Sequence, residues 1–242
     1  MKTQAVCGDC IKTNHASAWQ AQDAPFYEDK IAFVECRLGH KTAMVIQNSK
    51  TEILLSSAAE ALSQGFTFEA VASASAALER FYEFSLQVFF NAQKKAPARF
   101  QEFFKEMSNQ SERQLGAFML FHELELGNPF APTMKMTTFR NSVIHKGKIP
   151  SVEDAESFCA YVFDTVRTIR DQLVAQYGMD LIAQTIADDV KRRMHLVPQG
   201  MTATFASILT LMSISSATNA LSFRDAMQAF LKAREMTIQG QK

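Results

Sequence analysis

Two short cysteine and histidine pairs near the start of the chain have the spacing of metal ligands. Cys7 and Cys10 are separated by two residues, and Cys36 and His40 by three. Each pair can chelate one ion from a single turn, and three thiolates with one imidazole are a ligand set of closed, tetrahedral zinc sites. The pattern therefore predicts a structural zinc ion on these four residues, with His15 still open in place of His40. The alternative is three buried thiols beside a surface histidine.

The segment 1–50 that carries these ligands differs from the rest of the chain. Its β-prone runs 31–35 and 42–46 flank the second ligand pair, which predicts a small hairpin. A unit this short has too little apolar volume to fold alone, and a bound metal ion would supply the missing stability. We therefore expect residues 1–50 to form a zinc-binding β-hairpin or knuckle.

A second group of reactive side chains lies in segment 137–150. On a helix, Asn141 and His145 are about 40° apart around the axis, so one side chain can orient the other. A guanidinium such as that of Arg140 holds phosphate oxygens in a bidentate manner, and a neutral histidine can take the proton of a ribose 2′-hydroxyl. These groups suffice for metal-free RNA transesterification. The alternative is a helix end capped by histidine and lysine against its own dipole.

The charge around this motif favours a polyanionic partner, although the whole chain has equal numbers of basic and acidic residues, 25 of each. Segment 127–151 contains no acidic residue. Its lysines, Lys135, Lys146 and Lys148, are therefore candidate RNA-binding residues.

The directions of the two catalytic candidates on their helix favour a dimer. Arg140 and His145 point about 140° apart around one helix axis. One helix does not easily aim both at one atom, unless its turn is distorted or a second copy supplies the missing group. We therefore expect a homodimer with a shared site.

The elements that must position these residues are mostly helices, because apolar residues recur at helical spacing from residue 51 onward. We expect helices over 51–64, 67–94, 97–107, 111–126, 137–146, 152–177, 179–195, 201–217 and 223–236. The predicted fold class is mainly α, an antiparallel helical bundle preceded by the small zinc-binding hairpin. The predicted division is a knuckle (1–50), a bundle (51–178) and a C-terminal helical extension (179–242) that packs on the bundle or the dimer.

The composition excludes several classes of protein. Apolar residues make up 47% of the chain, so it is not disordered, and the scarcity of glycine and proline argues against a sandwich or barrel. We find no signal peptide and no run of about 18 apolar residues, and we expect a soluble, cytoplasmic protein without membrane contact. Clustered cysteines fit a metal site in a reducing compartment.

The motif Arg140-Asn141-x3-His145-x-Gly147 resembles the signature of the HEPN superfamily. A proline, a serine cap and a long amphipathic helix follow it, and the first long helix of the bundle is also similar to HEPN proteins. The resemblance covers roughly residues 51–177. It implies an all-α bundle that acts as a dimeric, metal-independent endoribonuclease, often a toxin or phage-defence effector.

Carried over by this resemblance, Arg140 and His145 are the catalytic pair, and Asn141 is the polar residue at the second position of the motif. The implied partners are RNA, a second copy of the chain, and an antitoxin or defence-system partner. Members with an intact motif also serve as nucleotide-binding or assembly modules. The alternative function is therefore a non-catalytic HEPN interaction or nucleotide-binding module with a structural zinc site.

For the other polar residues we expect structural roles. Glu79 is expected to lie on a solvated face, and the alternative is that it braces the motif arginine across the bundle. His122 is expected to be partly buried in its helix, and Cys159 to be a buried thiol on a helix seam. Arg192 and Arg193 are expected to form a solvated helix end.

Overall fold

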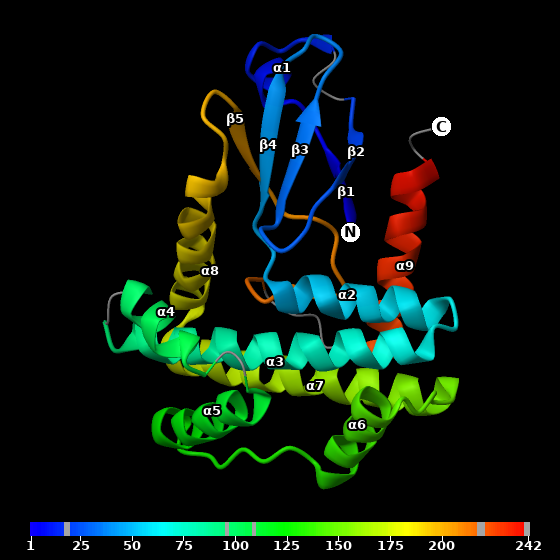
Figure 1. The fold of residues 1–242 in the computed structure, drawn as a ribbon, viewed down its shortest axis with the longest axis vertical. Helices are drawn as coiled ribbons and strands as arrows, with labels where there is room; N and C mark the ends of the chain where they lie inside the picture. Colours follow the sequence, from blue (N-terminus) through cyan, green and yellow to red (C-terminus); the bar gives the residue numbers. More distant parts are fainter. Residues whose placement is uncertain (17–19, 95–96, 108–109, 217–220, 240–242) are drawn as a thin grey trace. The chain divides into compact units, whose positions relative to one another are not determined.

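The chain forms two compact units in the computed structural model (Figure 1). The structure describes residues 1–16, 20–94, 97–107, 110–216 and 221–239. The first unit comprises Met1–Asn48 and Ile186–Ile208, and the second comprises Ser49–Thr185 and Leu209–Lys242. Residues 186–208 thus belong with the N-terminal segment and not with the C-terminal extension that the sequence predicts.

The first unit begins with a two-stranded sheet. Strand β1 (Lys2–Ala5) pairs antiparallel with β2 (Gln22–Pro25), and the short helix α1 (Gly8–Lys12) lies between them in sequence. Cys7 caps α1, because its sulfur accepts the backbone N–H of Cys10.

A three-stranded sheet follows, in the order β3-β4-β5. Strand β3 (Ile31–Glu35) pairs antiparallel with β4 (Lys41–Ile46), which confirms the predicted hairpin. Strand β5 (Thr202–Ala206) pairs parallel to β4 on its other side. The sheet therefore joins two segments that are far apart in the sequence.

The helix predicted over 201–217 is wrong, because residues 202–206 form β5 and the described residues that follow, up to 216, are neither helix nor strand. Threonine and phenylalanine favour a strand when a partner strand is available.

The packing of α1 also depends on β5. A Cβ atom added at Gly8 would lie 2.6 Å from Cγ2 of Thr204, so only glycine allows this approach.

Helix α8 (Met179–Arg193) ends in the first unit, where Arg193 is buried. The guanidinium of Arg193 donates to the carbonyl oxygen of Ile46 at 2.8 Å and to the carboxylate of Asp189 at 3.1 Å. Lys30, also buried, donates to the same carboxylate at 3.0 Å. The prediction of a solvated helix end is therefore wrong for Arg193, which ties the helix to the sheet.

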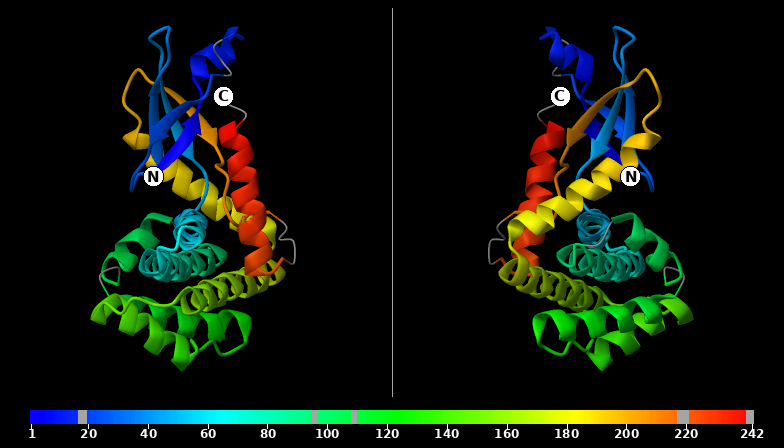
Figure 2. Two further views of the ribbon diagram at one scale, coloured as in Figure 1. Left: turned by 90° about the vertical axis from the view of Figure 1, so that its right-hand side faces the viewer. Right: turned by 90° about the vertical axis from the view of Figure 1, so that its left-hand side faces the viewer.

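The described part of the second unit is helical. Its elements are α2 (Lys50–Ser63), α3 (Thr67–Ala92), α4 (Pro97–Lys105), α5 (Ser111–Leu126), α6 (Met134–Lys146), α7 (Val152–Tyr177), the first turns of α8, and α9 (Phe223–Gln239). Helices α3 and α7 lie side by side, with α2 on one face of the pair and α5 and α6 on the other (Figure 1; Figure 2). The predicted mainly helical fold class with a small hairpin is confirmed. None of the described helices combines the length and the hydropathy that a membrane crossing requires.

Local signals explain where these helices begin. The hydroxyl of Ser151 accepts the N–H of Asp154 at 3.1 Å, so the predicted cap of α7 is confirmed. Ser49 and Glu52 form a reciprocal capping box at the start of α2, which the sequence analysis does not predict. The apolar seam of α7 is buried against α3, and Cys159 on that seam is fully buried, as expected.

Candidate functional site

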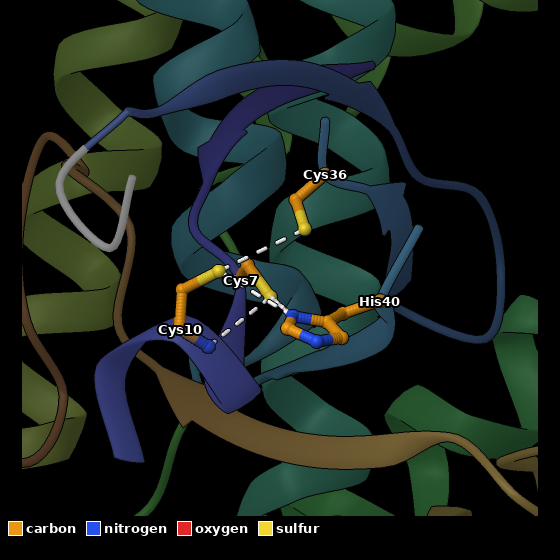
Figure 3. A group of neighbouring side chains, drawn as sticks. All are labelled: Cys7, Cys10, Cys36 and His40. Carbon is orange, nitrogen blue, oxygen red and sulfur yellow. Dashed lines mark hydrogen bonds between the residues drawn. The ribbon is translucent and has the colours of Figure 1, made fainter. Parts of the chain in front are cut away.

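The four predicted metal ligands meet at one point in the first unit. Figure 3 shows their side chains turned toward one another, and their ligand atoms all lie within 4.8 Å. Cys7 and Cys10 come from the start of α1, whereas Cys36 and His40 flank the turn between β3 and β4. Gly39 adopts a φ of +77° in that turn, and its N–H donates to the carbonyl oxygen of Cys36 at 2.8 Å.

Three of the distances between these atoms are close to those of a tetrahedral zinc site. The sulfurs of Cys10 and Cys36 are 3.7 Å apart, and Nδ1 of His40 is 3.5 Å from Cys10 Sγ and 3.8 Å from Cys7 Sγ. Zinc bonds of about 2.3 Å to sulfur and about 2.0–2.1 Å to nitrogen place tetrahedral ligands about 3.8 Å (S to S) and about 3.5 Å (S to N) apart. Among the described residues His15 is not part of the cluster, so His40 is the fourth candidate ligand.

The surroundings of the thiols are suited to a metal ion. Burial by itself would raise the pKa of Cys7, but hydrogen bonds from the Cys10 backbone and the Thr42 hydroxyl lower this pKa to about 6. Burial and the neighbouring sulfurs of Cys7 and Cys36 raise the pKa of Cys10 to about 12. Protons therefore compete with a metal ion for the cluster. All four positions are filled by protein groups, which is the arrangement of a structural site.

The motif residues of α6 also come together, within one chain. Arg140 Nη1 lies 3.3 Å from His145 Nε2 and donates to Asn141 Oδ1 at 3.1 Å. Our expectation that one helix does not easily bring Arg140 and His145 to one point is wrong, because the long arginine stem spans the angle between them. This geometric argument for a homodimer therefore no longer holds, and the homodimer remains a prediction that the HEPN resemblance implies.

Glu79 of α3 contacts the other terminal nitrogen of the guanidinium. Its carboxylate accepts Arg140 Nη2 at 2.5 Å, so the expected solvated face is wrong and Glu79 contacts the motif arginine across the bundle. Asn141 and His145 are exposed, and the helix ends just beyond them at Gly147, which has a φ of +67°. The cluster thus presents a fixed guanidinium beside an accessible imidazole.

The three candidate RNA-binding lysines, Lys135, Lys146 and Lys148, are all exposed on α6 or directly after it. Lys148 Nζ lies 5.6 Å from the ring centroid of Phe139. Their ammonium groups are therefore accessible to a polyanion on the helix that carries the motif.

A cavity of about 210 Å³ adjoins Arg140 among α3, α5, α6 and α7. It is lined by Ser75, Leu78, Glu79, Tyr82, Ser111, Glu112, Leu115, Pro132, Met136, Thr137, Arg140, Asn141, Phe158 and Tyr161. Sequence reasoning missed its aromatic residues and Glu112, because their spacing on each helix is ordinary. Burial, with Tyr161 and Glu79 nearby, raises the pKa of the Tyr82 hydroxyl, which therefore stays protonated.

His122 belongs to the core of the second unit. Its side chain is buried more completely than expected, with Nδ1 2.7 Å from the carbonyl oxygen of Asn128 and Nε2 3.0 Å from Gln172 Oε1. Both nitrogens have partners within the chain, so the histidine serves the packing of α5 on α7.

These features define a mainly helical protein with two clusters of polar residues. The small β unit carries four residues compatible with a zinc site, and the helical unit carries the polar motif. No family model, no curated protein and no solved structure matches the chain. The functional argument therefore starts from the geometry of the two clusters.

Proposed function

We propose that this protein is a metal-independent endoribonuclease of HEPN type, with a structural zinc ion in its first unit. The observation that supports it best is the pairing of Arg140 with His145 at 3.3 Å on an exposed helix end, where Glu79 fixes the guanidinium. RNA is the substrate, and exposed lysines of the same helix contact its backbone. The proposal includes a homodimer and an antitoxin or defence-system partner, as the resemblance implies.

The chemistry requires a base beside a phosphate-binding cation. Arginine only donates hydrogen bonds, so His145 Nε2, which lies 3.3 Å from Arg140 Nη1, is the unprotonated nitrogen of the ring. Its lone pair becomes available to a substrate proton when the guanidinium turns its N–H to the phosphate. This nitrogen takes the proton of the ribose 2′-hydroxyl, and the 2′-oxygen forms a bond to phosphorus. The bond from phosphorus to the 5′-oxygen breaks, and that oxygen takes a proton from solvent. The products are a 2′,3′-cyclic phosphate and a 5′-hydroxyl.

Arg140 stabilises the negative charge that develops on the non-bridging oxygens in this step. Its Nη2 is held by Glu79, and its Nη1 is the donor nearest His145. Asn141 accepts from Nη1 and so orients the guanidinium. The zinc ligands act only through folding, since a site filled by four protein groups leaves no position for substrate.

The alternative is a non-catalytic interaction or nucleotide-binding module. Arg140 already bonds to Glu79 and Asn141 within the chain, and this arrangement also fits a helix end that is held for packing. Activity decides between the two.

The test is incubation of the purified protein with total RNA in EDTA. We expect cleavage with cyclic phosphate ends, reduced by about 10²-fold or more in His145→Ala. His195→Ala is the matched control, because His195 is also exposed near a helix end but lies in the first unit. Intact RNA with both wild type and His145→Ala, or equal cleavage by both, favours the non-catalytic module.

A further inference from the structure

The cavity beside Arg140 is not used by the proposed cleavage mechanism. Arg140 lines it, and the cavity lies wholly within the second unit. We propose that it holds a guanine base of the RNA, next to the phosphate that Arg140 contacts. This inference rests on the proposed function, because it assigns the nucleotide that the same site accepts.

The size of the cavity limits its occupant. Pockets that enclose drug-sized ligands measure about 300–1,000 Å³, and this cavity measures about 210 Å³. It therefore accommodates a single ring system, while the sugar and phosphate remain outside with Arg140. A guanidinium at the edge of such a cavity favours an occupant that carries an anionic group.

Aromatic side chains line the cavity. Phe158 and Tyr161 come from successive turns of α7, with ring centroids 6.3 Å apart, and Tyr82 comes from α3. The Tyr161 hydroxyl accepts the N–H of Thr133 at 3.3 Å, which holds its ring in place. Proteins commonly bind unpaired RNA bases by stacking them on such rings.

The polar lining favours a base that donates hydrogen bonds. Glu79 and Glu112 are the two carboxylates of the lining, and Glu79 is bound to Arg140. Glu112 is exposed in the first turn of α5, and its Oε2 accepts the Ser111 hydroxyl at 3.4 Å. A carboxylate has about four lone-pair sites, so both of its oxygens can still accept from a ligand. Guanine presents two adjacent N–H donors on one edge, N1–H and N2–H, and these match the two oxygens of one carboxylate. The corresponding edge of adenine presents a single amino group.

Binding measurements on a cleavage-deficient protein test this separately from catalysis. The probes are guanosine and adenosine 3′-monophosphate, titrated calorimetrically into the His145→Ala protein. We expect tighter binding of the guanosine nucleotide, and a loss of that preference when Glu112→Gln is added. Tyr161→Leu should weaken binding of both nucleotides by about 10-fold. Tyr27→Leu is the matched control, because Tyr27 is 74% exposed and lies in the first unit.

The outcomes separate this inference from the proposed function. Glu112 is exposed, so its replacement keeps the fold and the test does not depend on the Tyr161 variant. Equal affinity for both nucleotides, or a preference that survives Glu112→Gln, overturns the assignment of guanine even if RNA is cleaved. Selective guanosine binding by a protein that cleaves no RNA supports guanine binding in the cavity and contradicts the proposed nuclease activity. Failure of both nucleotides to bind, as when a protein segment occupies the cavity, overturns the inference.

Discussion

Replacing Glu79 by glutamine tests whether the ion pair that fixes Arg140 serves cleavage. The carboxylate accepts Arg140 Nη2 at 2.5 Å, and the side chains of Glu79 and Arg140 are 29% and 22% exposed. Glutamine keeps the size and one acceptor oxygen but removes the charge. A hydrogen bond to a charged group contributes about 1.5–3 kcal/mol, and an exposed ion pair contributes about 0–1 kcal/mol. Partial exposure places this pair at about 1 kcal/mol.

This energy predicts a small, specific loss of activity. If it holds Arg140 in the orientation that contacts phosphate, Glu79→Gln lowers the cleavage rate by about fivefold. Arg140→Ala removes the guanidinium itself and should lower the rate by about 10²-fold or more. The assay is single-turnover cleavage of a labelled RNA in EDTA at saturating protein, with urea unfolding measured in parallel.

Glu83→Gln is the matched control for this experiment. Glu83 lies one turn further along α3 and accepts Arg80 at 2.6 Å, with side chains 28% and 26% exposed, so its pair resembles the first in length and exposure. We expect Glu83→Gln to lower stability by a similar amount and to leave the cleavage rate unchanged. Equal rates for Glu79→Gln and wild type, or equal losses in the two glutamate variants, would refute the positioning role of Glu79.

Four further predictions concern the two clusters, the assembly and the acid stability. Arg140→Lys keeps the charge but loses the planar fork, so single-turnover cleavage should fall nearly as far as in Arg140→Ala if phosphate contact is bidentate. Metal analysis of protein purified without added metal should find one zinc per chain, and Cys36→Ser should abolish it and unfold the first unit at a lower temperature. Light scattering should give twice the chain mass of 27.1 kDa, and a strict monomer at micromolar concentration would remove the homodimer. Burial would raise the pKa of Asp189, but the neighbouring cations Lys30 and Arg193 lower it below its unfolded value of about 3.9. The ionised carboxylate therefore stabilises the fold fully above pH ~3.9, and this stabilisation is lost as the pH falls through the lower pKa of the folded state. Asp189→Asn should therefore reduce the urea-unfolding free energy at neutral pH and flatten its decline in acid.

Features that depend on neighbouring residues could be predicted from the sequence. The helix over 152–177 has the bounds that its apolar seam and serine cap indicate. The hairpin of β3 and β4 and the two chelating pairs are equally local, since each pair occupies one turn. The sequence also predicts that these two pairs meet, because four zinc ligands on a short segment with little apolar core are expected to bind one stabilising metal ion.

Features that depend on contacts across the sequence required the tertiary structure. Strand β5 pairs with β4 from about 160 residues away, and its Thr202 donates to Asp9, 193 residues distant. Arg193 is buried because carbonyl oxygens and Asp189 surround it, although lysine and arginine at a helix end are usually solvated.

The candidate site shows the same division. The sequence alone identified the arginine, asparagine and histidine of the motif, because they lie within six residues of one helix. The angular positions of Arg140 and His145 suggested that they point apart, and only side-chain conformation brought them to 3.3 Å. Glu79 lies 61 residues from Arg140, and the cavity takes its lining from four helices. Periodicity specifies which face of each helix is apolar, but the packing of those faces decides which polar groups meet.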